Sequence, residues 1–429
     1  MRKNNLPFVI AIIFMIVGVA AWIYQLMNGL AVTNMRNSFD WGLYIAAFAF
    51  LVGIAAGGLI ISSSVYLFNI EKLKPFTRLA SLSAFASILG AGVMVLIDMG
   101  RIDRLYNLLL HPNLRSPLVW DVIVVTAYMF LTFFSVYVQL LPDWRKEGRG
   151  FLNGWTKKLS VEQVEEFSKK WSKRISVVGL PVALLIHTVT ALIFATQASR
   201  GWWNTATLPP DFILMAVSSG TALVMVIALL VVGREKFHQY QEAFQIMARI
   251  ISIALVAHFF LVSMDLLIHW WWGKGEALHI LSLVFGQYGL IYATEIILPA
   301  FTMFYFFTKK GTSSFNSLTL GSILLFIGVF THRMMLMLPS FNAIPLSGGI
   351  PGMDIESWAY PIALGQFEEG MPIFVNTWPY LPNLVEYGVA MLPFGLLLFV
   401  LAFFIRYYDF LPQKSYKNLQ TPKVDSFSV

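Results

Sequence analysis

Residues 41–69, WGLYIAAFAFLVGIAAGGLIISSSVYLFN, contain no charged side chain and are long enough to cross the hydrocarbon core of a bilayer, about 30 Å thick. Similar apolar runs recur along the chain, in which 57% of the residues are hydrophobic and 12% are charged. This pattern predicts an all-α polytopic membrane protein with about ten transmembrane helices. We expect the spans at about 6–30, 41–69, 76–97, 118–141, 173–196, 210–232, 245–270, 279–307, 314–338 and 384–408.

The basic residues indicate the orientation of the chain. Of the 30 Lys and Arg residues, 23 flank the spans on one side, six flank them on the other, and Arg333 falls within a span. Basic residues near span ends are retained in the cytoplasm. We therefore expect a multi-pass protein of the cytoplasmic (inner) membrane with both termini in the cytoplasm. The first apolar run, about 24 residues long, is expected to be a retained span and not a signal peptide.

The charge and the absence of cysteine exclude several classes of partner and cofactor. The net charge of +7 is concentrated in the predicted cytoplasmic loops, so it indicates contact with the anionic lipid bilayer and not with nucleic acid. A chain without cysteine cannot hold an iron–sulfur cluster through thiolates, a covalently attached haem or a disulfide. We expect neither haem nor an iron–sulfur cluster in this chain.

The order of the spans predicts an internal repeat. Spans two to five and six to nine each begin outside and contain four helices, which favours two four-helix bundles related by an axis along the membrane normal. Small residues in the first helix of each half, around Gly57 and Gly220, would allow close helix packing. The predicted segments are a first span and outer loop (1–40), two bundles (41–196 and 197–338), an outer cap loop (339–383), and a last span with a cytoplasmic tail (384–429).

Two segments between spans have their own signatures. In 142–172, Ser160 and Gln163 form a capping pattern ahead of charged residues, which predicts a short amphipathic helix lying at the membrane face. The outer segment 339–383 contains seven prolines and no Lys or Arg. Its many aromatic residues argue against disorder, so we expect a folded cap that offers a surface to a partner.

Ionisable residues within the spans are the candidates for function, because a charged group at a helix centre costs about 2.5–3.5 kcal/mol on insertion scales. Most of them lie toward the predicted outer ends of the spans. They are Asp98, Asp121, His187, His258, Asp265, His269, Glu295, His332 and Arg333.

The first-half residues fit a site for a quinone head group. His187 lies about 14 residues into its span, or roughly 21 Å from the cytoplasmic end. Asp98 and Asp121 fall near that depth, and Trp202 and Trp203 follow the same span. A histidine beside a carboxylate supplies a hydrogen-bond partner and a base near neutral pH. The alternatives are a structural hydrogen bond between helices for His187, and pairing of the two carboxylates with outer arginines.

The second-half residues fit either a proton path or a structural salt bridge. Asp265, Glu295, His332 and Arg333 are the candidates, and Glu295 lies four residues before Pro299, whose missing N–H frees a backbone carbonyl. Arg333 would be the cation of a salt bridge. A b-type haem between two histidines is also permitted, although their spacing does not select it, and no metal site is predicted.

Several motifs together resemble one family of membrane proteins. They are Trp41-Gly42-Leu43-Tyr44-Ile45 through Gly57, Asp98-Met-Gly-Arg101 leading to Ser116-Pro117-Leu118-Val119-Trp120-Asp121, His187-Thr188-Val189-Thr190 through Trp203 and Pro209-Pro210-x-Phe212 to Ser219-Gly220, Glu295-x-x-x-Pro299, and Tyr380-x-Pro382-x-x-x-Glu386. The chain is similar to the NrfD/PsrC family of quinone-interacting membrane subunits, and within it to the ten-span branch of HybB and DsrP. It departs from that pattern at Thr331-His332-Arg333-Met334.

The resemblance implies a function in a membrane oxidoreductase complex of anaerobic respiration. Such a subunit oxidises quinol or reduces quinone, here menaquinone, near the outer face. Electrons pass to or from a docked iron–sulfur subunit and through it to a catalytic redox subunit. By position, the resemblance assigns quinone binding and proton exchange to His187, Asp98 and Asp121. It assigns the lining of the pocket to Trp202, Trp203, Arg101 and Gly57.

Two other classes of protein share the same sequence features. An ion-coupled secondary transporter also has repeats and buried carboxylates, but carriers bind near the midplane, whereas most ionisable residues here lie toward the outer face. A purely structural membrane anchor predicts that replacing His187 or Asp98 disturbs assembly or changes nothing.

Overall fold

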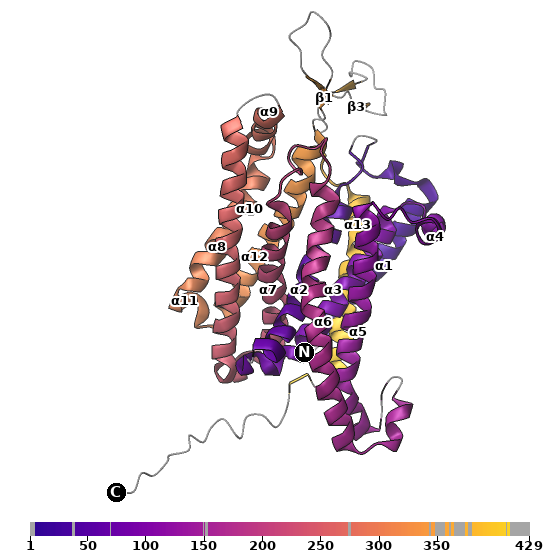
Figure 1. The fold of residues 1–429 in the computed structure, drawn as a ribbon, viewed down its shortest axis with the longest axis vertical. Helices are drawn as coiled ribbons and strands as arrows, with labels where there is room; N and C mark the ends of the chain where they lie inside the picture. Colours follow the sequence, from indigo (N-terminus) through magenta and orange to yellow (C-terminus); the bar gives the residue numbers. More distant parts are fainter. Residues whose placement is uncertain are drawn as a thin grey trace, which may run out of the picture.

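The computed structural model describes residues 5–36, 39–68, 70–148, 150, 153–272, 276–342, 345–347, 357–359, 362–363, 374–375, 380–408 and 410–411. Within these ranges most residues are helical, and the long helices run side by side along one axis (Figure 1). Most of the segment 339–383, and with it the predicted cap, lies outside the described residues, as do 412–429.

The long helices are α1 (Leu6–Asn28), α2 (Leu43–Phe68), α3 (Thr77–Asp98), α5 (Pro117–Glu147), α6 (Val161–Ala195), α7 (Leu208–Lys236), α8 (Gln241–Trp272), α10 (Gly289–Phe307), α12 (Phe315–Asn342) and α13 (Leu384–Tyr407). Short helices connect them: α4 (Leu105–Leu110), α9 (Glu276–Ser282), α11 (Lys309–Thr312), 3₁₀ turns η1 (Leu30–Val32), η2 (Glu71–Phe76), η3 (Ile102–Arg104), η4 (Gly154–Lys158) and η5 (Phe237–Tyr240), and a π turn η6 (Leu283–Gln287). Two antiparallel pairs, β1 (Pro345–Ser347) with β2 (Ser357–Ala359) and β3 (Ile362–Ala363) with β4 (Phe374–Val375), follow α12.

The long helices confirm the predicted polytopic all-α fold. Among the described residues, nine stretches are long and apolar enough to span a membrane, and one of them, the 64-residue stretch Leu208–Trp271, contains both α7 and α8. When α7 and α8 are counted separately, the described part of the chain has the ten spans expected from the sequence. The first and last residues of α1, α2, α3 and α13 lie within about two residues of the predicted span ends. At least one end of the other helices, α5, α6, α7, α8, α10 and α12, lies several residues or more from the predicted end.

The helices form two neighbouring sets of four. In the first, α2 contacts α3 and α6, and α5 contacts α3 and α6. In the second, α7 contacts α8 and α12, and α10 contacts the same two helices. α2 and α7 join the sets, while α1 packs on α13, which packs on α3 (Figure 1). Symmetry between the two sets stays a prediction.

The contact between α2 and α7 depends on two glycines. A Cβ atom added at Gly57 would collide with the backbone of Gly220, and one added at Gly220 would collide with the backbone of Gly57. The two helix backbones therefore touch at this point, which confirms the close approach predicted from the small residues. Gly57 serves this contact, and it does not line the cavity described below.

Replacing Gly57 by alanine is expected to destabilise the protein by about 1–3 kcal/mol, because the added methyl group must push two helix backbones apart. The measurement is the melting temperature of the purified membrane protein. Gly92→Ala is the control, since no atom lies within 4 Å of the place its Cβ would occupy. Equal melting temperatures for the two variants would contradict the prediction.

The prediction of a separate amphipathic helix in 142–172 is wrong. α5 continues to Glu147, and α6 begins at Val161 and runs without interruption through the span to Ala195. Its 35 residues make it about 52 Å long, well beyond the hydrocarbon thickness. The capping box is confirmed, with Ser160 accepting from Gln163 N at 3.2 Å. Hydropathy marks where the membrane begins, whereas the helix begins at its cap about three turns of mostly polar residues earlier.

The beginning of α13 is tied to the beginning of α2. Glu386, fully buried, accepts a hydrogen bond from the Tyr380 hydroxyl at 2.5 Å, and that hydroxyl accepts one from Leu43 N at 2.8 Å. Glu386 also accepts from the backbone N–H groups of Asn34 and Asn383 at 3.0 and 2.9 Å. These contacts fix the ends of the helices at the face where the ionisable residues gather.

Candidate functional site

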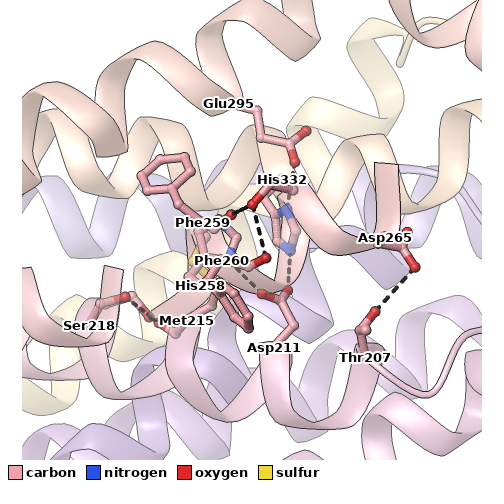
Figure 2. Close-up of polar contacts among 12 residues, drawn as sticks. Thr207, Asp211, Met215, Ser218, His258, Phe259, Phe260, Asp265, Glu295 and His332 are labelled. Carbon is pink, nitrogen blue, oxygen red and sulfur yellow. Dashed lines mark hydrogen bonds and ion pairs between the residues drawn. The ribbon is translucent and has the colours of Figure 1, made fainter. Parts of the chain in front are cut away.

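Four ionisable side chains from four helices meet in the second set. Asp211 of α7 lies between two imidazoles: its Oδ1 is 2.5 Å from His258 Nδ1, and its Oδ2 is 3.0 Å from His332 Nε2. On the other side of His332, Nδ1 is 2.7 Å from Glu295 Oε1 (Figure 2). We call Asp211, His258, Glu295 and His332 the carboxylate–histidine cluster.

Local features of α7 and of the contact between α10 and α12 help to place the residues of the cluster. Asp211 lies in the first turn of α7, which begins at Leu208 and continues with Pro209 and Pro210, whose rings restrict the backbone there. Near His332 the packing of α12 on α10 is tight, because a Cβ at Gly328 would collide with the Pro299 ring. That close approach brings His332 within hydrogen-bonding distance of Glu295.

The hydrogen bonds of His332 require a proton in the cluster. A neutral imidazole has one N–H donor and one lone pair. Both ring nitrogens of His332 face carboxyl oxygens. If both carboxyl groups were ionised and the ring neutral, the lone pair would face an anionic oxygen with no proton between them. The ring or one carboxyl group must therefore carry an additional proton, which these hydrogen bonds allow to move between them.

A cavity of about 60 Å³ opens beside the cluster. Asp211, Glu295 and His332 line it together with Asp265, whose Oδ1 accepts hydrogen bonds from Thr205 and Thr207 at 2.7 and 3.2 Å. The remaining lining residues are mostly apolar or aromatic: Trp202, Leu208, Leu261, Val262, Leu266, Tyr292, Met335 and Leu336. The cavity is large enough for a few water molecules in contact with several ionisable groups.

Three of the four predicted proton-path residues line this cavity, and the fourth does not. Arg333 is 1% exposed and lies with its guanidinium carbon 3.7 Å above the centre of the Phe212 ring. No hydrogen-bond partner of its three nitrogens is found among the described residues. The sequence left an ion pair with Glu295 or Asp265 as the alternative to a proton path. Among the described residues no such ion pair is found, and the guanidinium of Arg333 stacks on the Phe212 ring.

The predicted first-half site lies in the other set of helices. His187 of α6 is 2% exposed; the backbone of Gly53 lies beside its ring, and neither ring nitrogen forms a hydrogen bond of good geometry in the described part of the chain. One turn further along α6, Thr190 donates a hydrogen bond to Asp121 Oδ1 at 2.5 Å. Asp98 is half-buried at the end of α3. His187, Asp121 and Asp98 do not line the cavity of about 60 Å³.

The predicted pocket residues occupy different places. Trp202 lines the cavity and donates to Met335 O at 3.1 Å, while the buried Trp203 donates to Leu336 O at 2.5 Å, so the segment before α7 is fixed on α12. Arg101 is exposed and forms a two-bond pair with Asp103 at 2.9 and 2.8 Å. Arg101 and Trp203 therefore lie outside the cavity lining, and their roles as pocket residues stay predictions.

Asp211 was not among the residues singled out from the sequence. An acidic residue in the first turn of a helix is ordinarily explained by the helix dipole, so it carries no separate signal for function. The useful signal was its place directly after Pro209 and Pro210, at the same predicted depth as the other outer carboxylates. Among the described residues, no group of three or more His, Asp or Glu side chains is arranged to hold a metal ion.

The fold and the cluster together define a polytopic helical membrane protein with buried carboxyl and imidazole groups toward the predicted outer ends of its spans. The family model described as "Polysulphide reductase, NrfD" matches residues 31–345, so the chain belongs to the NrfD family. This confirms the family resemblance seen in the motifs. The match includes the carboxylate–histidine cluster and both sets of four helices, and it leaves α1 and α13 outside.

Individual relatives carry the names of reductase and oxidoreductase subunits. A Halobacterium salinarum protein, provisionally named as a membrane subunit of dimethyl sulfoxide reductase, is 34% identical over 60% of this chain and 59% of its own. The Hdr-like menaquinol oxidoreductase integral membrane subunit of Archaeoglobus fulgidus is 28% identical over 47% and 45%. A polysulfide reductase polypeptide of Wolinella succinogenes is 25% identical over 46% and 61%. The chain spans about half the length of the curated relatives it matches.

Proposed function

We propose that this chain is the quinone-reacting membrane subunit of a respiratory oxidoreductase complex. It would oxidise quinol, or reduce quinone, near the predicted outer face of the cytoplasmic membrane, with menaquinone as the expected substrate. The names of the related subunits, which include a menaquinol oxidoreductase, support this class of reaction. An ion-coupled transporter and a structural anchor are the alternatives that the experiments must separate.

The observation that carries the proposal is the state of His187. The backbone of Gly53 beside the ring can serve at most one nitrogen of His187. The other ring nitrogen needs a group that the described residues do not supply, because a buried polar group without a partner is costly. A quinol hydroxyl or a quinone carbonyl would provide such a partner. His187 would hold the head group by this hydrogen bond and take up the hydroxyl proton during oxidation.

Quinol oxidation releases two protons and two electrons, and both need a route away from the site. Asp121, one turn along from His187 through Thr190, and Asp98 lie at the ends of α5 and α3 that face the predicted outside. We assign them to proton release. The chain has no cysteine to hold an iron–sulfur cluster and we expect no haem in it, so the electrons would leave through a partner. An iron–sulfur subunit docked at the outer face, linked to a catalytic subunit, would accept them.

The carboxylate–histidine cluster is the second part of the proposal. Its shared proton and the adjoining cavity suit a proton path between the two sets of helices and the predicted outer surface. A quinone bound in the cavity itself is the competing placement, and it is favoured by the apolar walls and by Trp202.

Asp121→Asn tests the assignment of proton release. The amide still accepts the hydrogen bond from Thr190 but cannot take up a proton, so quinol-dependent reduction by the co-purified complex is expected to fall about tenfold. Quinol-analogue binding should change little, because Asp121 is assigned to proton release and not to holding the head group. Thr188→Val, which removes an exposed hydroxyl from α6, the helix of Thr190, is the control. Full activity of the Asp121→Asn variant would show that Asp121 is not needed for proton release.

A further inference from the structure

A second cavity lies at the membrane face opposite the carboxylate–histidine cluster. It has a volume of about 580 Å³ and is enclosed by η2 and the adjoining ends of α2, α3, α5 and α6. Five basic and three acidic side chains line it: Lys74, Arg78, Lys146, Lys169 and Lys173, with Glu71, Asp143 and Glu165. We call this cavity the basic cleft.

The acidic side chains neutralise only some of the basic ones. Arg78 pairs with Asp143 at 2.5 Å, and Lys146 pairs with Glu165 at 2.6 Å. For the lysines at 74, 169 and 173, no ion pair is found in the described part of the chain. The basic cleft therefore has a net positive charge and three ammonium groups available to a ligand.

Tryptophans place the basic cleft at the level of the lipid head groups. Trp155 and Trp171 are 45% and 40% exposed on this part of the protein, as is usual for residues at a membrane–water interface. On α6, Trp171 lies between Lys169 and Lys173 in sequence, so both lysines are within about 3 Å of its height along the helix axis. Exposed apolar residues, beginning with Val177 and Val178 (51% and 53%), follow on the membrane side.

We propose that the basic cleft binds the phosphate-bearing head group of an anionic phospholipid. A basic pocket between transmembrane helices on the positively charged side of a membrane protein is suited to such a head group. The apolar surface that begins at Val177 offers a place for the acyl chains, which a soluble phosphate lacks. Figure 1 shows α5 and α6 extending beyond the neighbouring helices, and both helices contribute residues to the lining of the basic cleft. This site is independent of the quinone reaction.

Titration of the purified full-length protein with phospholipid, followed by native mass spectrometry, tests the proposal. Phosphatidylglycerol is expected to bind more tightly than phosphatidylcholine. The double variant Lys169→Gln/Lys173→Gln should weaken phosphatidylglycerol binding roughly 30-fold, because each basic side chain near an anionic surface contributes about fivefold. The control is Lys157→Gln/Lys158→Gln, which removes the same charge from exposed residues that do not line the basic cleft.

Each contrary outcome overturns a defined part of the proposal. Equal affinity for the two lipids, or equal weakening in both double variants, would mean that only the general charge of this face is involved. Displacement of the lipid by millimolar inorganic phosphate would assign the basic cleft to a soluble phosphate compound. The melting temperatures of both double variants should match that of the wild type, because the exchanged lysines form no ion pair among the described residues.

Discussion

His187→Ala is expected to lower quinol-dependent turnover of the complex about 100-fold or more, since a positioned general base contributes at least that much to a proton transfer. His187 is buried on α6, and at least one of its ring nitrogens has no partner among the described residues. Alanine removes both the base and the hydrogen bond to the head group. We therefore expect weaker binding of a quinol analogue as well as slower turnover.

The measurement is quinol-dependent reduction by the co-purified complex, with preparations matched for subunit content. His238→Ala is the control, because His238 is exposed in η5, away from both sets of ionisable residues. Loss of turnover in an intact complex would separate the proposal from a structural anchor, for which assembly alone would suffer. Unchanged turnover and unchanged analogue binding would indicate that the quinone binds in the cavity beside His332. Glu295→Gln would then be the next variant to measure.

Asp211→Ala is expected to cause the largest loss of stability, about 3 kcal/mol, because breaking a buried pair leaves its partners uncompensated. Asp211 is 4% exposed and serves two imidazoles at once, at 2.5 and 3.0 Å. Without its carboxylate, His258 loses its partner and His332 keeps only Glu295. The alanine also leaves an empty space near the start of α7.

Thermal unfolding of the purified protein measures this effect. Asp103→Ala is the control, since Asp103 forms an exposed pair with Arg101 and is expected to leave the melting temperature unchanged. Asp211→Asn should lie between the two, because an amide can retain one of the hydrogen bonds. If Asp211→Ala melted at the wild-type temperature, the described cluster would not be a stabilising unit of the folded protein.

The sequence predicted the spans well and their packing only in outline. Length and hydropathy placed the long helices, because a helix in lipid must be apolar for about 20 residues. The same criterion failed at α6, where the helix continues about 12 residues beyond the apolar run to its cap at Ser160. The glycine pair at Gly57 and Gly220 was found from the sequence, since only small residues permit two backbones to touch.

The candidate site was predicted in its composition but not in its connections. Asp265, Glu295 and His332 were selected because they are ionisable and lie within spans, and all three line one cavity. Asp211, which bonds to His332 across 121 positions of sequence, was missed. Arg333 was a candidate for a proton path or for a salt bridge with Glu295 or Asp265, and in the structure it stacks on Phe212.

By itself, the sequence determined that this protein crosses the membrane many times and gathers its ionisable residues toward one face, because the cost of placing charge in lipid acts on each residue separately. It also determined the absence of thiolate-bound cofactors, through the lack of cysteine. Only the tertiary structure decided which of these residues meet. Hydrogen bonds act over about 3 Å, and the rotation and relative height of α7, α8, α10 and α12 are set by packing between helices far apart in the chain.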